Sequence, residues 1–281
     1  MYTLETVIQE WDAAGQHGDA GQRTRQAERW LPYYAFIAKR QRNMPFAFPE
    51  EPDEFVAGLL RDGLLRPEDT VLDIGAGTGG YALELAPHCR RVTALELSAD
   101  CLDLLKAHAD ACGLENIRTV NTAWEHYETA ERFDLVFSSM CPAICNVEEL
   151  RRMEALSKRA CCLITVGRGS YDKHRRAMME ALDIRPKGGM VTEAIHYYNA
   201  LYLMGRQPNV ACRTLRQTFD IPEAAVLEQY PVYFRIFGVE EDRATAFLKQ
   251  YLAEHADHGV LHDESVIHQV MITWEIEANK Y

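Results

Sequence analysis

Residues Val71 to Gly80 read VLDIGAGTGG, an apolar run that passes directly into a turn with four glycines. The aliphatic residues predict a strand over 70–74. Glycine permits the tight turn that follows and lets the backbone approach a ligand closely. A helix is expected over 79–86, and its first N–H groups would face whatever the turn binds. This segment therefore predicts a strand, a turn and a helix that together form one side of a ligand site.

The chain on either side of this unit alternates between apolar runs and helical patterns. Strands alternating with helices of roughly 10–15 residues are typical of βαβ units, whose parallel strands are covered on both faces. Near-continuous apolar runs agree with strands that are buried on both sides. Residues 53–167 are thus predicted to form a doubly wound, Rossmann-like α/β core that binds a cofactor. We expect its other strands over 91–97, 117–121, 133–138 and 161–166, and its other helices over 55–60, 100–112 and 147–157.

The chain before this core reads as helical. Residues 1–52 are expected to form an N-terminal helical cap, and they end in a linker that contains Pro45, Pro49 and Pro52. Proline fixes its own φ and discourages helix in the residue before it, so the cap helices should end ahead of this linker.

After the core the pattern loosens. Residues 168–222 are expected to form a helical insertion that holds the acceptor, although 209–219 is ambiguous between helix and strand. Residues 223–281 are expected to complete the sheet with C-terminal strands and a helix. The resulting fold is a mostly parallel sheet of about seven strands with an antiparallel edge, flanked by N-terminal helices and a helical insertion. The late strands are expected over 227–237 and 265–276, and the late helix over 241–255.

The composition excludes several classes of protein. Hydrophobic residues make up 47% of the 281 residues, too many for a disordered chain. No apolar run approaches the roughly 20 residues that cross a bilayer, and no secretory signal is visible, so we expect a cytoplasmic protein. The formal net charge of −12 disfavours nucleic acid and anionic membranes as partners, without excluding RNA. The eight cysteines show no paired metal-ligand spacing, so we expect free thiols and no metal site.

Two acidic residues narrow the choice of ligand. Gly75, Gly77 and Gly80 fit the dinucleotide pattern GxGxxG, which alone leaves a nicotinamide cofactor open. Asp73 lies two residues before the first glycine, where a carboxylate suits an amino group or a sulfonium better than a pyrophosphate. Glu96 ends the next expected strand, where an acidic side chain can accept hydrogen bonds from both hydroxyls of a ribose.

The pattern Asp73-x-Gly75-x-Gly77-x-Gly79, followed by Glu96, resembles the class I S-adenosylmethionine-dependent methyltransferases over roughly residues 55–167. The resemblance implies S-adenosylmethionine as cofactor and S-adenosylhomocysteine as product. It implies that the glycine turn faces the methionine and the ribose, and that Glu96 holds the ribose diol. The segment after the third strand, Ala123 and Trp124, would border the adenine, and Leu97, the residue after Glu96, would pack against it. The plainer interpretation is that the turn is a tight corner and that Trp124 belongs to the core.

The end of the fourth expected strand would lie beside the transferable methyl group, because ligands of open α/β sheets bind at the carboxyl ends of the strands. Ser138 and Met140 are therefore expected to contact the cofactor. Family members that methylate planar amino groups carry an Asn/Asp-Pro-Pro-aromatic motif here, and this chain has Ser-Met-Cys-Pro instead. Cys141 and Cys145 would either bind a thiophilic metal or metalloid, or pack beneath the cofactor.

The acceptor itself is not readable from the sequence. Cys141, Tyr34 and Tyr198 are the candidate catalytic residues, and the basic run from Arg23 to Arg42 would bind an anion or form a solvated helix face. We expect methyl transfer to a small molecule. The alternatives are an RNA or protein methyltransferase, a regulator that binds S-adenosylmethionine without transferring its methyl group, and a nicotinamide-dependent oxidoreductase.

Overall fold

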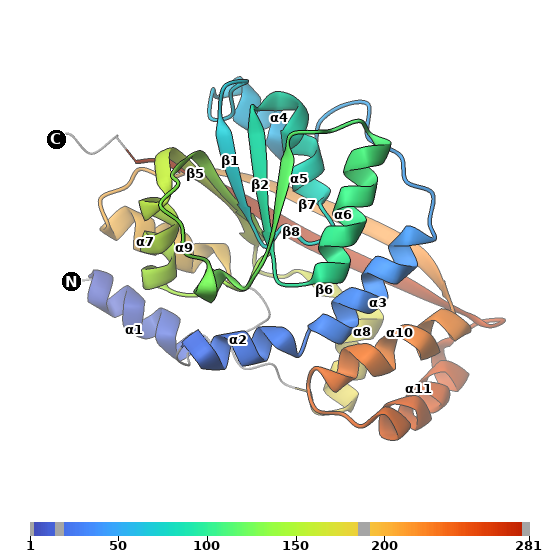
Figure 1. Cartoon of the computed structure of the whole chain (residues 1–281). Helices are drawn as coiled ribbons and strands as arrows, with labels where there is room; N and C mark the ends of the chain where they lie inside the picture. Colours follow the sequence, from blue (N-terminus) through green and yellow to red (C-terminus); the bar gives the residue numbers. More distant parts are fainter. Residues whose placement is uncertain (1–2, 15–19, 185–191, 277–281) are drawn as a thin grey trace. The chain divides into compact units, whose positions relative to one another are not determined.

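The computed structural model describes residues 3–14, 20–184 and 192–276 (Figure 1). The chain divides into two compact units. The first, which we call the core unit, consists of Met1–Val166, Gly188–Cys212 and Val270–Tyr281. The second unit consists of Gly167–Lys187 and Arg213–Gln269.

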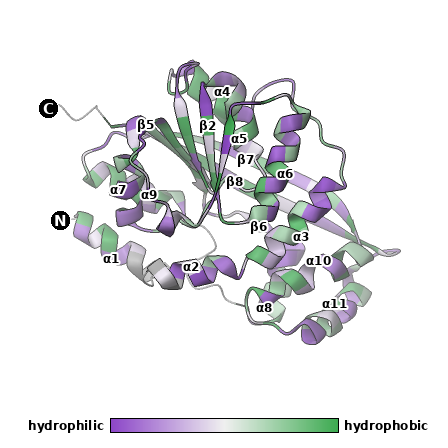
Figure 2. Ribbon diagram, in the orientation of Figure 1, coloured by the Kyte–Doolittle hydropathy of each residue, from purple (hydrophilic) through white to green (hydrophobic). Residues whose placement is uncertain are grey.

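A parallel sheet forms the centre of the core unit, in the order β3-β2-β1-β4-β5, with β8 beyond β5. This order confirms the Rossmann-like α/β fold that the sequence predicts. Val71 and Leu72, adjacent in β1, belong to different hydrophobic clusters, because successive side chains of a strand point to opposite faces. Burial on both faces explains the apolar runs, which are coloured green along β5 in Figure 2. The strands are β1 (Thr70–Ile74), β2 (Arg91–Glu96), β3 (Ile117–Asn121), β4 (Phe133–Ser139), β5 (Ser157–Val166) and β8 (Val260–Glu275).

Helices pack around this sheet close to the positions expected from the sequence. Two of the helices that follow a strand begin with a side-chain cap: Ser98 accepts from the N–H of Cys101, and Asn146 accepts from the N–H of Glu149. Both caps follow directly on a loop at the carboxyl end of a strand. The helices are α4 (Glu54–Arg61), α5 (Gly80–Leu85), η1 (Ala86–His88), α6 (Ala99–Ala111), η2 (Trp124–His126), α7 (Val147–Ala155) and α9 (Ala194–Leu203).

The N-terminal region is helical, as predicted, and consists of α1 (Leu4–Ala14), α2 (Ala20–Glu28) and α3 (Leu31–Arg42). We call these helices the N-terminal strap. Trp11 of α1 is buried and packs edge-on against Tyr197 of α9, with ring centroids 5.0 Å apart. At the other end, Ala38 of α3 is buried together with residues of α6. Apolar packing therefore attaches both ends of the strap to the rest of the core unit. Figure 1 shows α3 running alongside α6.

The second unit contains β6 (Tyr171–Asp172), α8 (Lys173–Ala181), α10 (Glu223–Arg235) and α11 (Glu241–His255). β6 pairs antiparallel with β8. β7 (Asn209–Pro222) also pairs with β8. Side chains of β7 and β8 form hydrogen bonds in the pairs Arg213–Gln269 and Asp220–His262. The residue number rises along β7 as that of the partner in β8 falls, as antiparallel pairing requires. The antiparallel edge predicted from the sequence is thus confirmed.

The prediction of a strand over 227–237 is wrong, because this segment lies mostly in helix α10. Its aromatic residues are typical of a strand, yet the buried Tyr230, Tyr233 and Phe234 follow, together with Val226 earlier in α10, the spacing of one helix face. The ambiguous segment 209–219 is part of β7, so residues 168–222 contain strands as well as α8 and α9. Among the described residues, no helix is long and apolar enough to span a bilayer.

Candidate cofactor site

The glycine turn after β1 has the backbone conformation that glycine favours. Gly75, Gly77 and Gly79 all have positive φ, between 56° and 97°. A Cβ at Gly75 would collide with the thiol of Cys141, and a Cβ at Gly79 would lie 2.7 Å from Cγ of Leu105. At Gly77 a Cβ would meet no described atom within 4 Å. The turn is therefore closely packed at its two ends and faces open space at its centre.

Glu96 closes this turn from the end of β2. Its Oε2 accepts the N–H of Gly77 at 2.9 Å and its Oε1 accepts the N–H of Ser98 at 2.8 Å. Asn121 Nδ2 donates to the backbone carbonyls of Glu96 and Leu97, at 3.0 and 2.8 Å. Both carboxylate oxygens are thus fixed in place, and each keeps a lone pair for another donor. The sequence analysis missed Asn121, although it ends the next parallel strand and so lies at the same edge.

Asp73 is the second acidic group at this edge, and it is 2% exposed. Its Oδ2 has no hydrogen-bond partner among the described residues. Burial, and secondarily the charge of Glu96, raise the pKa of Asp73 to about 7. A buried carboxylate oxygen without a partner is costly, and a cationic ligand would remove that cost. The site therefore fits a ligand with a positively charged group near Asp73.

Ala123 and Trp124, expected beside the adenine, are both buried. The indole N–H of Trp124 donates to Oε2 of Glu149 at 2.6 Å, and the guanidinium of Arg152 lies 4.1 Å from the ring centroid. These contacts fix the indole among protein groups, in line with the core interpretation of Trp124. The short helix η2 that begins at this residue still follows β3 directly at the carboxyl edge.

The loop after β4 brings Cys141 onto the glycine turn. Ser138 is buried and its hydroxyl donates to the carbonyl of Ile74 at 3.0 Å. Met140 has φ +52°, an uncommon conformation for a residue with a side chain and one that often marks functional sites. Burial, followed by the charges of Glu96 and other acidic groups, raises the pKa of Cys141 to about 12. Cys141 is therefore a neutral thiol at physiological pH.

Tyr34 and Tyr198, the tyrosine candidates, lie in different environments. Burial raises the pKa of Tyr34, and the next contributions come from Cys141 and Glu96, so Tyr34 of α3 lies near both. Tyr198 of α9 is 37% exposed and stacks on Tyr202, with ring centroids 6.4 Å apart. The buried neighbour Tyr197 donates to the carbonyl of Ile144 in the loop after β4. Tyr34 is thus close enough to Cys141 and Glu96 for their charges to act on it, whereas Tyr198 lies on an exposed helix face.

Cys145 has a pKa raised to about 11, again chiefly by burial. Soft metals bind the thiolate, which burial disfavours here. Within the described part of the chain, no three His, Cys, Asp or Glu side chains gather so as to hold a metal ion. These observations favour packing over a thiophilic site for Cys141 and Cys145.

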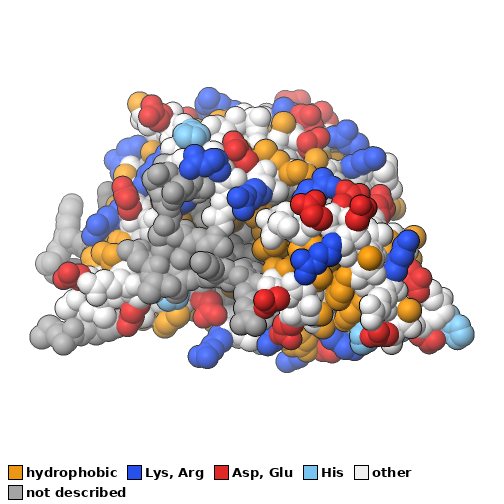
Figure 3. Space-filling view, turned by 90° about the horizontal axis from the view of Figure 1, so that it is seen from below, with side chains coloured by type: hydrophobic (Ala, Val, Ile, Leu, Met, Phe, Trp, Pro, Cys, Tyr) orange, Lys and Arg blue, Asp and Glu red, His pale blue; other side chains and the backbone are white. Residues whose placement is uncertain are grey.

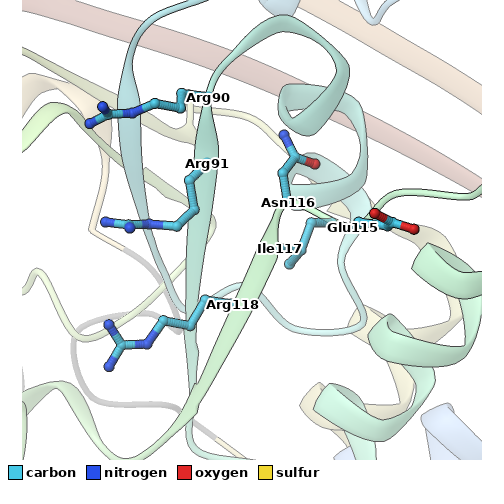
Figure 4. A pocket seen from close by; sticks show the side chains of 6 residues that line it. All are labelled: Arg90, Arg91, Glu115, Asn116, Ile117 and Arg118. Carbon is cyan, nitrogen blue, oxygen red and sulfur yellow. The ribbon is translucent and has the colours of Figure 1, made fainter.

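A hollow of about 420 Å³ lies at the opposite edge of the sheet, where β2 and β3 begin (Figure 4). Three arginines line this hollow, and two of them, Arg91 and Arg118, form ion pairs with Glu131. Cofactors of open α/β sheets bind at the carboxyl ends of the strands, so this hollow is separate from the candidate site. It is lined by Arg90, Arg91, Glu115, Asn116, Ile117 and Arg118.

The strand order, the glycine turn and the acidic end of β2 together define a class I S-adenosylmethionine-dependent methyltransferase domain. The comparison with protein families agrees: residues 71–161 match the model described as a methyltransferase domain. The chain therefore contains such a domain, for which S-adenosylmethionine is the methyl donor.

Curated relatives match part of the chain. An uncharacterized protein of Haemophilus influenzae is 26% identical over 162 residues, which are 57% of this chain and 59% of the relative. A release factor glutamine methyltransferase of Shewanella oneidensis is 28% identical over 134 residues, 40% of this chain and 47% of the relative. The match thus spans about half the length of either relative. A crystal structure from Bacillus halodurans shares the fold, with a TM-score of 0.52 and 16% identity over 79% of this chain and 99% of the other.

Proposed function

We propose that this protein transfers the methyl group of S-adenosylmethionine to a small-molecule acceptor. The observation that carries the proposal is the pair of buried carboxylates beside the glycine turn, Glu96 held by two backbone N–H groups and Asp73 with an unpartnered Oδ2. The bound cofactor would supply an electrophilic methyl carbon on a positively charged sulfur. The open space at Gly77 leaves room for a ligand beside the turn.

The residues of the chain would mainly bind, orient and exclude water. Glu96 would accept the ribose hydroxyls and, once ionised, Asp73 would face the positive charge of the ligand. Tyr34 and the neutral thiol of Cys141 would form the wall near the methyl group. Displacement at a sulfonium depends chiefly on positioning and desolvation, so a nucleophilic acceptor would need no dedicated base.

Two observations support a small acceptor. Tyr34 belongs to the N-terminal strap and lies near Cys141 and Glu96, so the strap encloses this edge of the sheet. On the face shown in Figure 3, acidic and basic side chains of the described residues are interspersed, with none of the basic stripe that marks a nucleic-acid footprint.

A protein acceptor is the second candidate, because one relative is a release factor glutamine methyltransferase. The segment Ser139-Met140-Cys141-Pro142 weighs against methylation of a glutamine side chain. It differs from the Asn/Asp-Pro-Pro-aromatic motif of the family members that act on planar amino groups.

Formation of S-adenosylhomocysteine with separate acceptor pools would test the proposal. The protein is incubated with S-adenosylmethionine and either low-molecular-weight metabolites, proteins or RNA from one cell extract. We expect turnover with the metabolite pool, and its loss in Glu96→Ala but not in Glu115→Ala, a control in the hollow at the opposite edge. Turnover with the protein or RNA pool alone would refute the small acceptor. Cofactor binding without turnover in any pool would indicate a regulator.

A further inference from the structure

Glu149 joins three parts of the core unit that are far apart in the sequence. It lies in the first turn of α7 and is 4% exposed. Its Oε2 accepts the indole N–H of Trp124 from η2, and its Oε1 accepts Nη2 of Arg23 from α2, both at 2.6 Å. Arg152, one turn further along α7, lies 3.5 Å from Oε2. The strap, the segment after β3 and the helix after β4 thus meet at one carboxylate.

Arg23 faces a second buried carboxylate as well. Its Nε lies 3.7 Å from Oε1 of Glu125. The side chains of Glu125 and Glu149 are 4% and 5% exposed, and that of Arg23 is 17% exposed. Removing one partner of a buried ion pair leaves a charge that water cannot reach, which is far costlier than losing a surface pair. Loss of Arg23 would leave two buried carboxylates with less positive charge between them.

The attachment of α2 differs from that of its neighbours in the strap. Helices α1 and α3 are held by buried apolar side chains, Trp11 and Ala38 among them. Helix α2 contacts η2 through Arg23 and through Thr24, whose hydroxyl lies 3.4 Å from Nε2 of His126. Because these contacts are polar, α2 can separate from η2 and rebind without exposing a hydrophobic core.

We propose that Arg23 is a latch, a positioning residue that holds α2 closed over the adenine side of the site and limits how fast the cofactor exchanges. The inference rests on the proposed function, since it takes η2 to border the adenine. Glu149, the partner of Arg23, donates its backbone N–H to Oδ1 of Asn146 at 2.8 Å, so the latch lies next to the loop after β4. Opening the latch frees α2 from η2 while α1 and α3 stay attached.

Trypsin tests the latch without any cofactor. Arg29, exposed just after α2, is a cleavage site that all variants keep. We expect Arg23→Gln to raise the rate of cleavage after Arg29 about tenfold, with Arg23→Lys in between. Arg25→Gln, a change at an exposed position of the same helix, should leave the rate unchanged. Adding Glu125→Gln to Arg23→Gln should restore part of the protection, because one of the two carboxylates is then neutral. Equal rates in Arg23→Gln and Arg25→Gln would overturn the latch.

The rate of cofactor exchange tests whether Arg23 limits the dissociation of the ligand. Labelled S-adenosylhomocysteine bound to the full chain is chased with an excess of unlabelled S-adenosylhomocysteine. We expect it to dissociate about tenfold faster from Arg23→Gln than from Arg25→Gln. Faster cleavage with unchanged dissociation would overturn the role in exchange. Failure of the unaltered protein to bind the ligand would refute the proposed function instead, and the cleavage rates would still decide whether Arg23 holds α2.

Discussion

Substitution of Asp73 by Asn offers a sharp test of the cofactor site, because the pKa of Asp73 lies close to neutrality. The carboxyl is buried, its Oδ2 has no partner among the described residues, and its pKa is raised from 3.8 to about 7. A ligand with a positive charge beside Asp73 favours the ionised form, so binding should expel the proton. Affinity for S-adenosylmethionine should therefore rise with pH up to about 7 and then level off.

The pKa shift of Asp73 sets the size of the expected effects on stability and binding. Ionising Asp73 in the free protein costs about 1.4 kcal/mol for each pKa unit, or about 4 kcal/mol as an order of magnitude for the shift from 3.8 to about 7. Since the folded protein holds this proton and the unfolded chain does not, stability falls as pH rises between these values. Asp73→Asn should remove that fall. It should also weaken binding above about pH 7 by roughly 10- to 100-fold, because a hydrogen bond to a charged group contributes about 1.5–3 kcal/mol.

Calorimetry in two buffers of different ionisation enthalpy measures the proton directly. At about pH 6 the unaltered protein should release close to one proton more than Asp73→Asn when it binds S-adenosylmethionine. Glu115→Gln, at the opposite edge of the sheet, should behave like the unaltered protein. Equal proton release by the unaltered protein and Asp73→Asn would refute the placement of the charged group beside Asp73.

Further changes test other parts of the structure. Glu96→Ala should weaken binding of S-adenosylhomocysteine about tenfold or more by calorimetry, and unchanged affinity would mean that the ribose lies elsewhere. Gly75→Ala should lower the thermal midpoint through its clash with Cys141 and its positive φ, and Cys141→Gly should recover part of the loss; no recovery would contradict the contact. Burial lowers the pKa of His174 despite the opposing charge of Asp263, so urea denaturation should show stability falling as pH drops below about 6.5, with a smaller fall in His174→Gln.

Those parts of the site that lie next to a strand end were predictable from the sequence. Asp73 and the glycines follow one another along the chain, and Glu96 ends the next strand, so parallel pairing brings them to one edge. Arg23 and Glu149 are 126 residues apart, and no local pattern links them. The basic run that contains Arg23 resembles a solvated helix face, and only the packing of the strap reveals that Arg23 lies between two buried carboxylates.

The C-terminal region shows where local preference misleads. Aromatic and β-branched residues favour strands as a class, so helix α10 was predicted as a strand. Burial in α10 follows helical spacing, and that spacing becomes visible only once the buried residues are known. Strand β7 is largely exposed along its length and lacks the alternation that marks a half-buried strand, so its segment was ambiguous. In both segments, long-range packing decides the structure.

Cys141 shows how the structure separates two interpretations that the sequence leaves open. A thiophilic ligand needs a thiolate with free space in front of its sulfur. The Cys141 sulfur instead lies where a side chain of residue 75 would begin, so it fills the volume that Gly75 leaves open. Burial raises the pKa of Cys141 most, and the nearby charges of Glu96 and Asp73 raise it further, so the thiol stays neutral. The same carboxylates favour a cationic ligand, so the charges that oppose ionisation of Cys141 would also attract a sulfonium.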